Sequence, residues 1–404
     1  MSTPAPSSAS SHSPRPRVAL IGISGYGSIY LAIVRAARDR GELDLVAAVV
    51  INPDEEHANE KELASHGCRI FRDYEAMLRD LAGQIDLCLI PTGIQWHARM
   101  TIAALKSGAC VLVEKPLAGS LEETEQIRAA ERETGRWVAV GFQDIYCPVN
   151  RWLKEQLLAG VIGQLTSVRF LGLWPRSSSY FARNHWAGRL VADGAPVKDS
   201  LLNNAFAHFV NLGLYFLGST PDGSATVTVD SAELLRAHPI ETFDTSVVQA
   251  RTAEGARFWV GASHTTQRTL EPVLRLFGSR GSITWRHGED VLVEPDGIPA
   301  ERRKIPDIDQ ARQRMFDLVL ARLRDPSVSI CDTALAQAHT RFIEGVHAAA
   351  AGLPVPASRI EWATGASDER RWPVVHGLEE ALERAFDTGS TLAEAGFTVT
   401  SPQS

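Results

Sequence analysis

The sequence predicts an α/β protein with an N-terminal, doubly wound parallel sheet and a second domain built on a large, mainly antiparallel sheet. Two observations support this fold class. From Arg17 onward, short runs that are apolar on both faces alternate with amphipathic helical stretches, which is typical of a parallel sheet covered by helices on both sides. Beyond about residue 160, short glycine-containing turns join the apolar runs instead, and such turns favour antiparallel pairing.

The first domain is placed at residues 16–145, after a tail at 1–15 that is mostly Ser, Pro and Ala and is expected to be disordered. Helical spacing covers 29–37 and 100–105. Ser120 and Glu123 form a capping box at the start of a further, charged helix. The expected strands are 18–23, 45–51, 85–90, 111–113 and 137–140.

The second domain is placed at residues 146–352. Its expected strands are 165–174, 225–235, 246–252, 257–263, 273–277, 282–285 and 291–293. Its expected helices are 148–160, 204–217, 309–323 and 333–351. Residues 353–404 form a C-terminal extension with one predicted helix near 378–386, and the sequence gives that extension no place in the fold.

Composition narrows the class of protein. The chain has 404 residues, a formal net charge of −7 and a pI of about 6.0, which argues against nucleic-acid or anionic-membrane partners. No apolar run approaches the roughly 18 residues of a membrane span. The scattered cysteines form no C-x-x-C pair, so we expect no disulfide framework and no metal site, and a cytoplasmic location follows by default. They are Cys68, Cys88, Cys110, Cys147 and Cys331.

A glycine-rich turn closes the first apolar strand. It reads Gly22-Ile23-Ser24-Gly25-Tyr26-Gly27 and follows the G-x-G-x-x-G pattern, with Ser24 at the middle glycine. Small residues let the backbone approach a pyrophosphate, and the N-terminus of the next helix supplies N–H donors. The turn predicts a site for NAD or NADP. A tight strand–helix turn that binds nothing is the alternative.

The residues at the end of the second strand do not distinguish NAD from NADP as the expected cofactor. An acidic residue there would hold a ribose 2′-hydroxyl, and an arginine would accommodate a 2′-phosphate. The sequence has neither at that tip. It has Asn52, which can bond a ribose hydroxyl.

Further along, Glu114-Lys115-Pro116 follows the fourth apolar strand. Ligands of such sheets bind at the carboxyl ends of the strands, which favours a functional role for Lys115. A surface lysine before a turn is the alternative.

Taken together, this triplet, the stretch Pro91 to His97 and the pair Asn204-x-x-x-His208 resemble the Gfo/Idh/MocA oxidoreductases, which include glucose–fructose oxidoreductase and inositol dehydrogenase. The resemblance spans roughly residues 17–351. It implies a Rossmann domain, an open sheet that commonly mediates homo-oligomerisation to a dimer or tetramer, and hydride transfer between a nicotinamide and a carbinol or carbonyl carbon of a sugar, cyclitol or glycoside derivative. It also implies that Pro91, Thr92 and Glu114 lie at the cofactor.

The resemblance implies a catalytic lysine, aspartate and histidine. Lys115 and His208 match the first and last, whereas Asn204 stands at the aspartate position. Four residues of helix would put Asn204 and His208 on one face. Without a charge beside it, His208 is expected to be a weaker base, so that catalysis depends more on Lys115; Asp199 is the nearest carboxylate. Alternatively, His208 packs the helix, and Asn203 and Asn204 cap it.

Several residues are candidates for substrate binding. His97 either lines the pocket or caps its helix. After the last Rossmann strand, the resemblance implies pocket residues at Gln143, Asp144 and Tyr146. A loop rich in groups that stack on sugars or bond hydroxyls follows, and it could instead pack on another subunit. The loop candidates are Trp174, Arg176, Tyr180, Arg183, Asn184, His185 and Trp186, joined by Asn203 and His208 from the helical segment.

Two other functions compete with a sugar dehydrogenase. One is a redox-neutral, NAD-dependent enzyme that cleaves glycosides after a transient oxidation. The other is a ligand-sensing protein without turnover, a reading that Asn204 favours and that Lys115 and His208 oppose.

Overall fold

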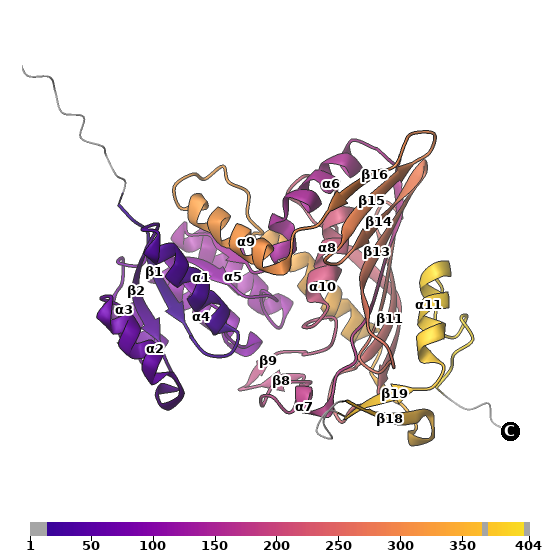
Figure 1. The fold of residues 1–404 in the computed structure, drawn as a ribbon, viewed down its shortest axis with the longest axis horizontal. Coiled ribbons are helices and arrows are strands. Elements are labelled where there is room, and N and C mark those ends of the chain that lie inside the picture. The colour runs from indigo at the N-terminus through magenta and orange to yellow at the C-terminus, as the bar shows by residue number, and fades with distance from the viewer. Residues whose placement is uncertain (1–13, 366–370, 400–404) are drawn as a thin grey trace, which may run out of the picture.

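The computed structural model describes residues 14–365 and 371–399, and these fold around two large sheets (Figure 1). The predicted tail at 1–15 lies almost entirely outside them. The N-terminal sheet is parallel, with strand order β3-β2-β1-β4-β5-β6, which confirms the doubly wound prediction. Its strands are β1 (Arg17–Ile21), β2 (Asp44–Val49), β3 (Arg69–Phe71), β4 (Leu87–Ile90), β5 (Cys110–Val113) and β6 (Val138–Val140).

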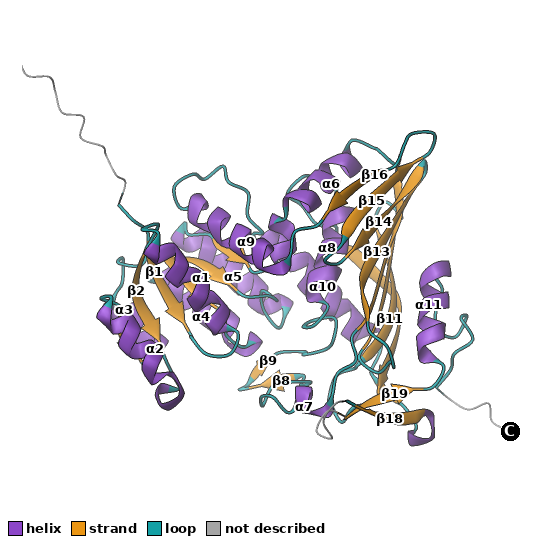
Figure 2. Cartoon of the chain, viewed as in Figure 1, coloured by secondary structure: helices purple, strands orange, loops and turns teal. Residues whose placement is uncertain are grey.

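Helices lie in front of and behind this sheet (Figure 2). They are α1 (Gly27–Asp39), α2 (Pro53–Ser65), α3 (Tyr74–Asp80), α4 (Ile94–Lys106) and α5 (Leu121–Thr134). Every residue of β4 and β5 is buried, as expected for strands covered on both faces. The carboxyl ends of β1, β4 and β5 therefore meet at one edge, where Gly22, Pro91 and Glu114 follow them.

The second sheet has the order β16-β15-β14-β13-β7-β12-β11-β10-β17. Its neighbours are antiparallel except for β7–β12 and β10–β17, so the prediction of a mainly antiparallel sheet is confirmed. The strands are β7 (Leu165–Leu173), β10 (Val227–Arg236), β11 (Thr245–Thr252), β12 (Arg257–Ser263), β13 (Leu270–Gly278), β14 (Gly281–Arg286), β15 (Asp290–Pro295), β16 (Glu301–Lys304) and β17 (Leu353–Pro354).

Helices α8 (Ala207–Leu217) and α10 (Thr333–Ala349) cover the face of this sheet that looks toward the N-terminal domain (Figure 1). The segments η1 (Gln143–Tyr146), α6 (Pro148–Leu158) and α9 (Ile308–Arg322) complete the layer between the two sheets. The predicted helix at 204–217 was too long at its start. Residues 201–206 form turns, and the helix begins only at Ala207.

The segment after β7 crosses back to the N-terminal domain. It contains α7 (Ser178–Phe181) and the small hairpin β8 (Val191–Ala192) and β9 (Ala195–Pro196). Ile94 of α4 is buried against Ala192 and Val197, and Gln95 Nε2 donates to Asp193 Oδ2 at 3.1 Å. The loop is therefore held against both domains.

The C-terminal extension covers the opposite face of the second sheet. It contains η2 (Ala357–Arg359), β18 (Ile360–Thr364), β19 (Arg371–Val375) and α11 (Leu378–Thr388), so the predicted helix is confirmed. Leu382 and Phe386 of α11 are buried in one cluster with Leu171 and Trp259. Within the described residues, no helix is long and apolar enough to cross a membrane.

Candidate active site

The glycine-rich turn joins β1 to α1 and leaves backbone open to solvent. Gly22 has φ +91°, a conformation that favours glycine, and a Cβ on Gly27 would lie 2.4 Å from Gly22 O. Gly25 has open space around it, and no side chain caps the helix at Tyr26. The helix start, with no side chain bonded to its N–H groups and with open space at Gly25, fits the pyrophosphate of a dinucleotide.

Pro91 and Thr92 lie beside this turn, as predicted for the strand that follows it in the sheet. The Pro91 ring is 3.7 Å from the Cβ position of Gly27, and the Thr92 methyl is 3.8 Å from that of Gly22. His97, by contrast, is fully buried, with Nδ1 2.7 Å from Pro116 O and Nε2 3.1 Å from Thr92 O. Burial lowers its pKa to about 4. His97 thus ties two loops together and does not face the cleft.

Glu114 holds the backbone of Lys115 in place. Its carboxylate is 5% exposed and accepts hydrogen bonds from Tyr30 Oη at 2.6 Å and from Lys115 N at 3.1 Å. Burial raises its pKa. With both oxygens engaged inside the domain, Glu114 orients the lysine backbone rather than reaching into the cofactor cleft.

Lys115 ends in a chain of polar contacts that leads to a carboxylate. Its Nζ donates to Asn204 O at 2.9 Å and to Asn204 Oδ1 at 3.2 Å, and Asn204 Nδ2 donates to Asp199 Oδ1 at 2.8 Å. Burial lowers the pKa of Lys115, whereas Glu114 and Asp199 raise it. Asp199 therefore supplies a negative charge to this cluster. The charge acts on Lys115, not on His208 as the sequence had suggested.

His208 has a different carboxylate partner. Its side chain is 12% exposed, and Nδ1 lies 3.5 Å from Asp144 Oδ2. Burial lowers the pKa of His208 well below its usual value, and the positive charge of Lys115 is the second largest cause. The Lys115 charge therefore acts on the imidazole ring. Burial raises the pKa of Asp144 to about 6.

The expectation that Asn204 and His208 share a helix face is wrong. Asn204 precedes α8, in turns, and its carbonyl and amide are engaged by Lys115 and Asp199. The group beside His208 is instead Asp144, which η1 brings from the end of the first domain. Sequence analysis placed Asp144 among the pocket candidates but did not pair it with His208, because no local pattern links the two segments.

Arg312 is a further residue that sequence reasoning missed. It lies on α9, with its guanidinium 5.7 Å from the centroid of the Tyr26 ring, and its charge lowers the pKa of both Asp144 and His208. An arginine inside an ordinary amphipathic helix carries no sequence signal for this position. Its place is evident only from the packing of α9 on η1.

Two of the predicted polar residues, Asn203 and Asn184, have structural partners. Asn203 is 2% exposed and its amide donates to Val197 O and Lys198 O. Asn184 Oδ1 accepts from two backbone N–H groups of its own turn. These two asparagines shape the loop rather than face the cleft. Gln143 is 4% exposed, and its Oε1 has no partner within the described residues.

At the end of β2, Asn52 precedes α2 and is exposed. Arg72 reaches the same tip from the segment after β3, where its Nη1 donates to Val50 O at 3.2 Å. Sequence analysis found no arginine at this tip, since Arg72 follows a different strand. The tip therefore has an amide that can bond a ribose hydroxyl, and a guanidinium nearby that is already paired with Glu60.

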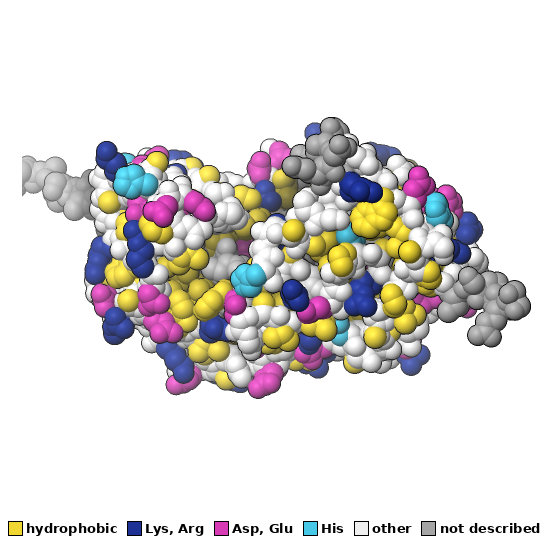
Figure 3. Space-filling view, turned by 90° about the horizontal axis from the view of Figure 1, so that it is seen from below, with side chains coloured by type: hydrophobic (Ala, Val, Ile, Leu, Met, Phe, Trp, Pro, Cys, Tyr) yellow, Lys and Arg dark blue, Asp and Glu magenta, His cyan; other side chains and the backbone are white. Residues whose placement is uncertain are grey.

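The aromatic and arginine side chains of the loop cluster around Tyr180, and one of the arginines lies close to Asp199. The Tyr180 ring has the guanidinium of Arg183 3.8 Å from its centroid and that of Arg176 4.9 Å away. Arg183 Nη2 lies 4.0 Å from Asp199 Oδ2, and Trp186 packs against the hairpin. Seen from below, the surface between the two domains is hollowed, with hydrophobic side chains along its walls (Figure 3).

Two family descriptions match this architecture. "Oxidoreductase family, NAD-binding Rossmann fold" matches residues 16–142, and "GFO/IDH/MocA C-terminal domain" matches residues 150–284. The chain belongs to this oxidoreductase family. The resemblance drawn from the sequence motifs is thereby confirmed.

The similar curated proteins include an inositol 2-dehydrogenase from Rubrobacter xylanophilus, 25% identical over 54% of this chain and 57% of that protein. Inositol 2-dehydrogenase 4 from Saccharopolyspora erythraea is 32% identical over 37% of this chain and 42% of that protein. The matches thus span about half the length of these relatives.

Solved structures share most of this fold at low sequence identity. A 3-ketoreductase from Actinomadura kijaniata, in complex with NADP and TDP-benzene, has a TM-score of 0.67 at 18% identity, covering 85% of this chain and 100% of that one. Levoglucosan dehydrogenase, in complex with NADH and levoglucosan, has a TM-score of 0.68 at 17% identity, covering 83% and 97%.

Proposed function

We propose that this chain is an NAD(P)-dependent oxidoreductase that transfers hydride between the nicotinamide and a carbinol or carbonyl carbon of a sugar, cyclitol or glycoside derivative. The observation that carries the proposal is the hydrogen bond from Lys115 Nζ, in the first domain, to Asn204, which lies just before the helix α8 that carries His208. Family membership supports the reaction class.

In this proposal the bound cofactor supplies a hydride acceptor or donor. When the alcohol is oxidised, its carbon loses hydride and its hydroxyl loses a proton. His208, neutral because its pKa is low, takes that proton, and ionised Asp144 stabilises the imidazolium that forms. Lys115, aimed by Asn204, donates a hydrogen bond to the same oxygen.

The proposal includes a cytoplasmic location and a homo-oligomer. All cysteines in the described residues are free and buried, which suits a reducing compartment. Residues of α11 cover part of the outer face of the second sheet, so subunits would meet on what α11 leaves open, including the exposed edge strand β16.

The test has two steps. Fluorescence titration with NADH and NADPH should show binding, and a screen of sugars, cyclitols and glycosides with the oxidised cofactors should show absorbance growing at 340 nm. Cleavage of a glycoside without accumulating reduced cofactor would point to the redox-neutral alternative. Cofactor and sugar binding without any turnover would point to the ligand-sensing alternative.

A further inference from the structure

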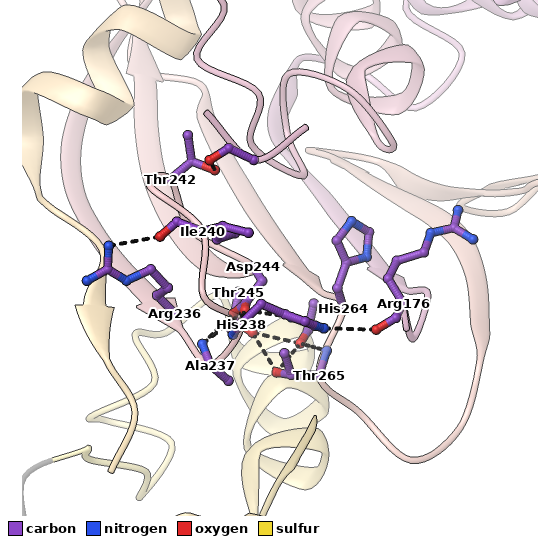
Figure 4. Close-up of polar contacts among 12 residues, drawn as sticks. Arg176, Arg236, Ala237, His238, Ile240, Thr242, Asp244, Thr245, His264 and Thr265 are labelled. Atoms are coloured by element: carbon purple, nitrogen blue, oxygen red, sulfur yellow. Dashed lines mark hydrogen bonds and ion pairs between the residues drawn. The ribbon is translucent and has the colours of Figure 1, made fainter. Parts of the chain in front are cut away.

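The loop that carries Arg176 is held by a fully buried pair of side chains. His238 Nδ1 lies 2.8 Å from Asp244 Oδ2, and both side chains are 0% exposed (Figure 4). Asp244 also accepts from the backbone N–H groups of Ala237 and His238. The other ring nitrogen of His238 lies 2.9 Å from Arg176 O, so the buried pair anchors the Arg176 backbone.

A second contact fixes the same residue from its other side. Arg176 N donates to His264 O at 3.1 Å. In Figure 4, the Arg176 side chain turns away from the network of dashed bonds and rises on the same side as the His264 ring. A deeply buried pair and a backbone hydrogen bond thus aim one guanidinium.

The Arg176 guanidinium has no carboxylate partner among the described residues, whereas two other arginines of the same loop each have one. Arg183 lies 4.0 Å from Asp199, and Arg189 pairs with Glu241. Within residues 14–365 and 371–399, no carboxylate pairs with Arg176, and its Nε is buried without a hydrogen-bond partner. Only aromatic faces hold it, with the Tyr180 ring centroid at 4.9 Å and the Trp174 ring centroid at 5.5 Å. A buried donor without an acceptor is costly unless a ligand supplies one.

The position of Arg176 links it to the catalytic groups. Trp174 and His264 stack on Phe206, with ring centroids 4.8 and 5.5 Å apart. Phe206 immediately precedes α8, the helix that carries His208. Arg176, stacked on Trp174, therefore lies one aromatic layer away from the start of the helix that carries His208.

We propose that Arg176 binds an anionic substituent, a carboxylate or a phosphate, on the sugar-like substrate. This inference rests on the proposed function and narrows its substrate class from sugars in general to acidic sugars. A planar guanidinium binds two oxygens of such a group at once, and both anions present that geometry. The aromatic walls would meanwhile cover the apolar face of the ring.

Isothermal titration of the full chain, with and without NAD, tests the proposal with three probes: D-glucuronate, D-glucose 6-phosphate and D-glucose. We expect at least one acidic probe to bind roughly 10- to 100-fold more tightly than glucose, since a hydrogen bond to a charged group is at stake. Which acid binds better distinguishes a carboxylate from a phosphate. The preference should shrink as salt concentration rises.

Arg176→Gln should abolish the preference for the acid while leaving glucose binding within about threefold, because only a charged contact is removed. Arg176→Lys should keep part of the preference for the acid. This variant tests the proposal if Arg176→Gln unfolds at too low a temperature to be measured. Arg189→Gln is the matched control: it alters an exposed arginine further along the same loop, already paired with Glu241, and should change nothing.

Equal binding of all three probes, no binding of any of them, or equal weakening of acid and glucose in Arg176→Gln would overturn the proposal. The proposed function fails separately. If the acid preference is present but NADH and NADPH do not bind, the redox assignment is lost and the anion site remains.

Discussion

The two sides of the cleft are built in different ways. On the N-terminal side, neighbours along the chain set the functional backbone: Gly22 to Gly27 form one turn, and Glu114 receives the N–H of Lys115. On the other side, each candidate group lies against a residue far along the chain: His208 Nδ1 is 3.5 Å from Asp144 Oδ2, and Arg176 O is 2.9 Å from His238 Nε2. The first side can be recognised from motifs, whereas the second exists only once the chain has folded.

The largest effect is expected from removing the side chain of Lys115, which connects the two sides of the cleft through Asn204. Lys115→Met should lower kcat about 10³-fold, because it removes a hydrogen-bond donor at the reacting oxygen. NADH affinity should stay within about threefold, since the glycine-rich turn is unchanged. Turnover at 340 nm and fluorescence titration measure the two effects. Lys106→Met, at the exposed end of α4, is the control. Retention of more than a tenth of kcat would exclude the proposed role.

Asp144→Asn tests the long-range partner of His208. The pKa of Asp144 is raised to about 6, so the carboxylate is ionised above that pH and protonated below it. Wild-type kcat/KM for oxidation should therefore fall as the pH drops below about 6. The asparagine variant should be roughly 10- to 100-fold slower at pH 7.5 and should lose this acidic limb. A variant that keeps both the rate and the limb would show that Asp144 does not assist His208.

Asn204→Asp distinguishes the position expected from sequence from the one observed. The new carboxylate would face Asp199 at about the present 2.8 Å, and two carboxylates so close share a proton. We expect kcat to fall about tenfold because Lys115 is re-aimed, while the acidic limb of the pH profile stays in place. A shift of that limb would mean that residue 204 acts on His208 after all.

The smallest expected effect concerns the cofactor. Asn52→Asp places a carboxylate at the end of β2, beside Arg72, where a ribose 2′-phosphate would lie. NADPH should then bind about tenfold more weakly relative to NADH, since like charges repel and a 2′-hydroxyl can still donate. Parallel fluorescence titrations give the ratio. An unchanged ratio would place the ribose away from Asn52.

Sequence patterns were sufficient for much of the regular structure, although the helices α2 and α3 were not predicted. The five expected strands of the first sheet, the glycine-rich turn and the amphipathic helix α11 depend on local composition and periodicity, and all are present. The three-residue strand β3 and the fully exposed strand β16 were missed, because neither has an apolar pattern long enough to recognise.

The site was predicted less completely than the fold. Lys115 and His208 carry motif signals, and Lys115 hydrogen-bonds to Asn204, four residues before His208. His97 and Asn203 carry similar signals, yet they are buried and hold backbone. The same residue types serve either purpose, and only tertiary packing decides between them. Arg312 has no local signal at all, because α9 places it near Tyr26 from the other domain.

The placement of α11 bears on how the protein can be engineered. Leu171 and Trp259 are sealed only because Leu382 and Phe386 cover them. A chain cut before Leu378 would turn this sealed layer outward, and the truncated protein would precipitate or stick to chaperones.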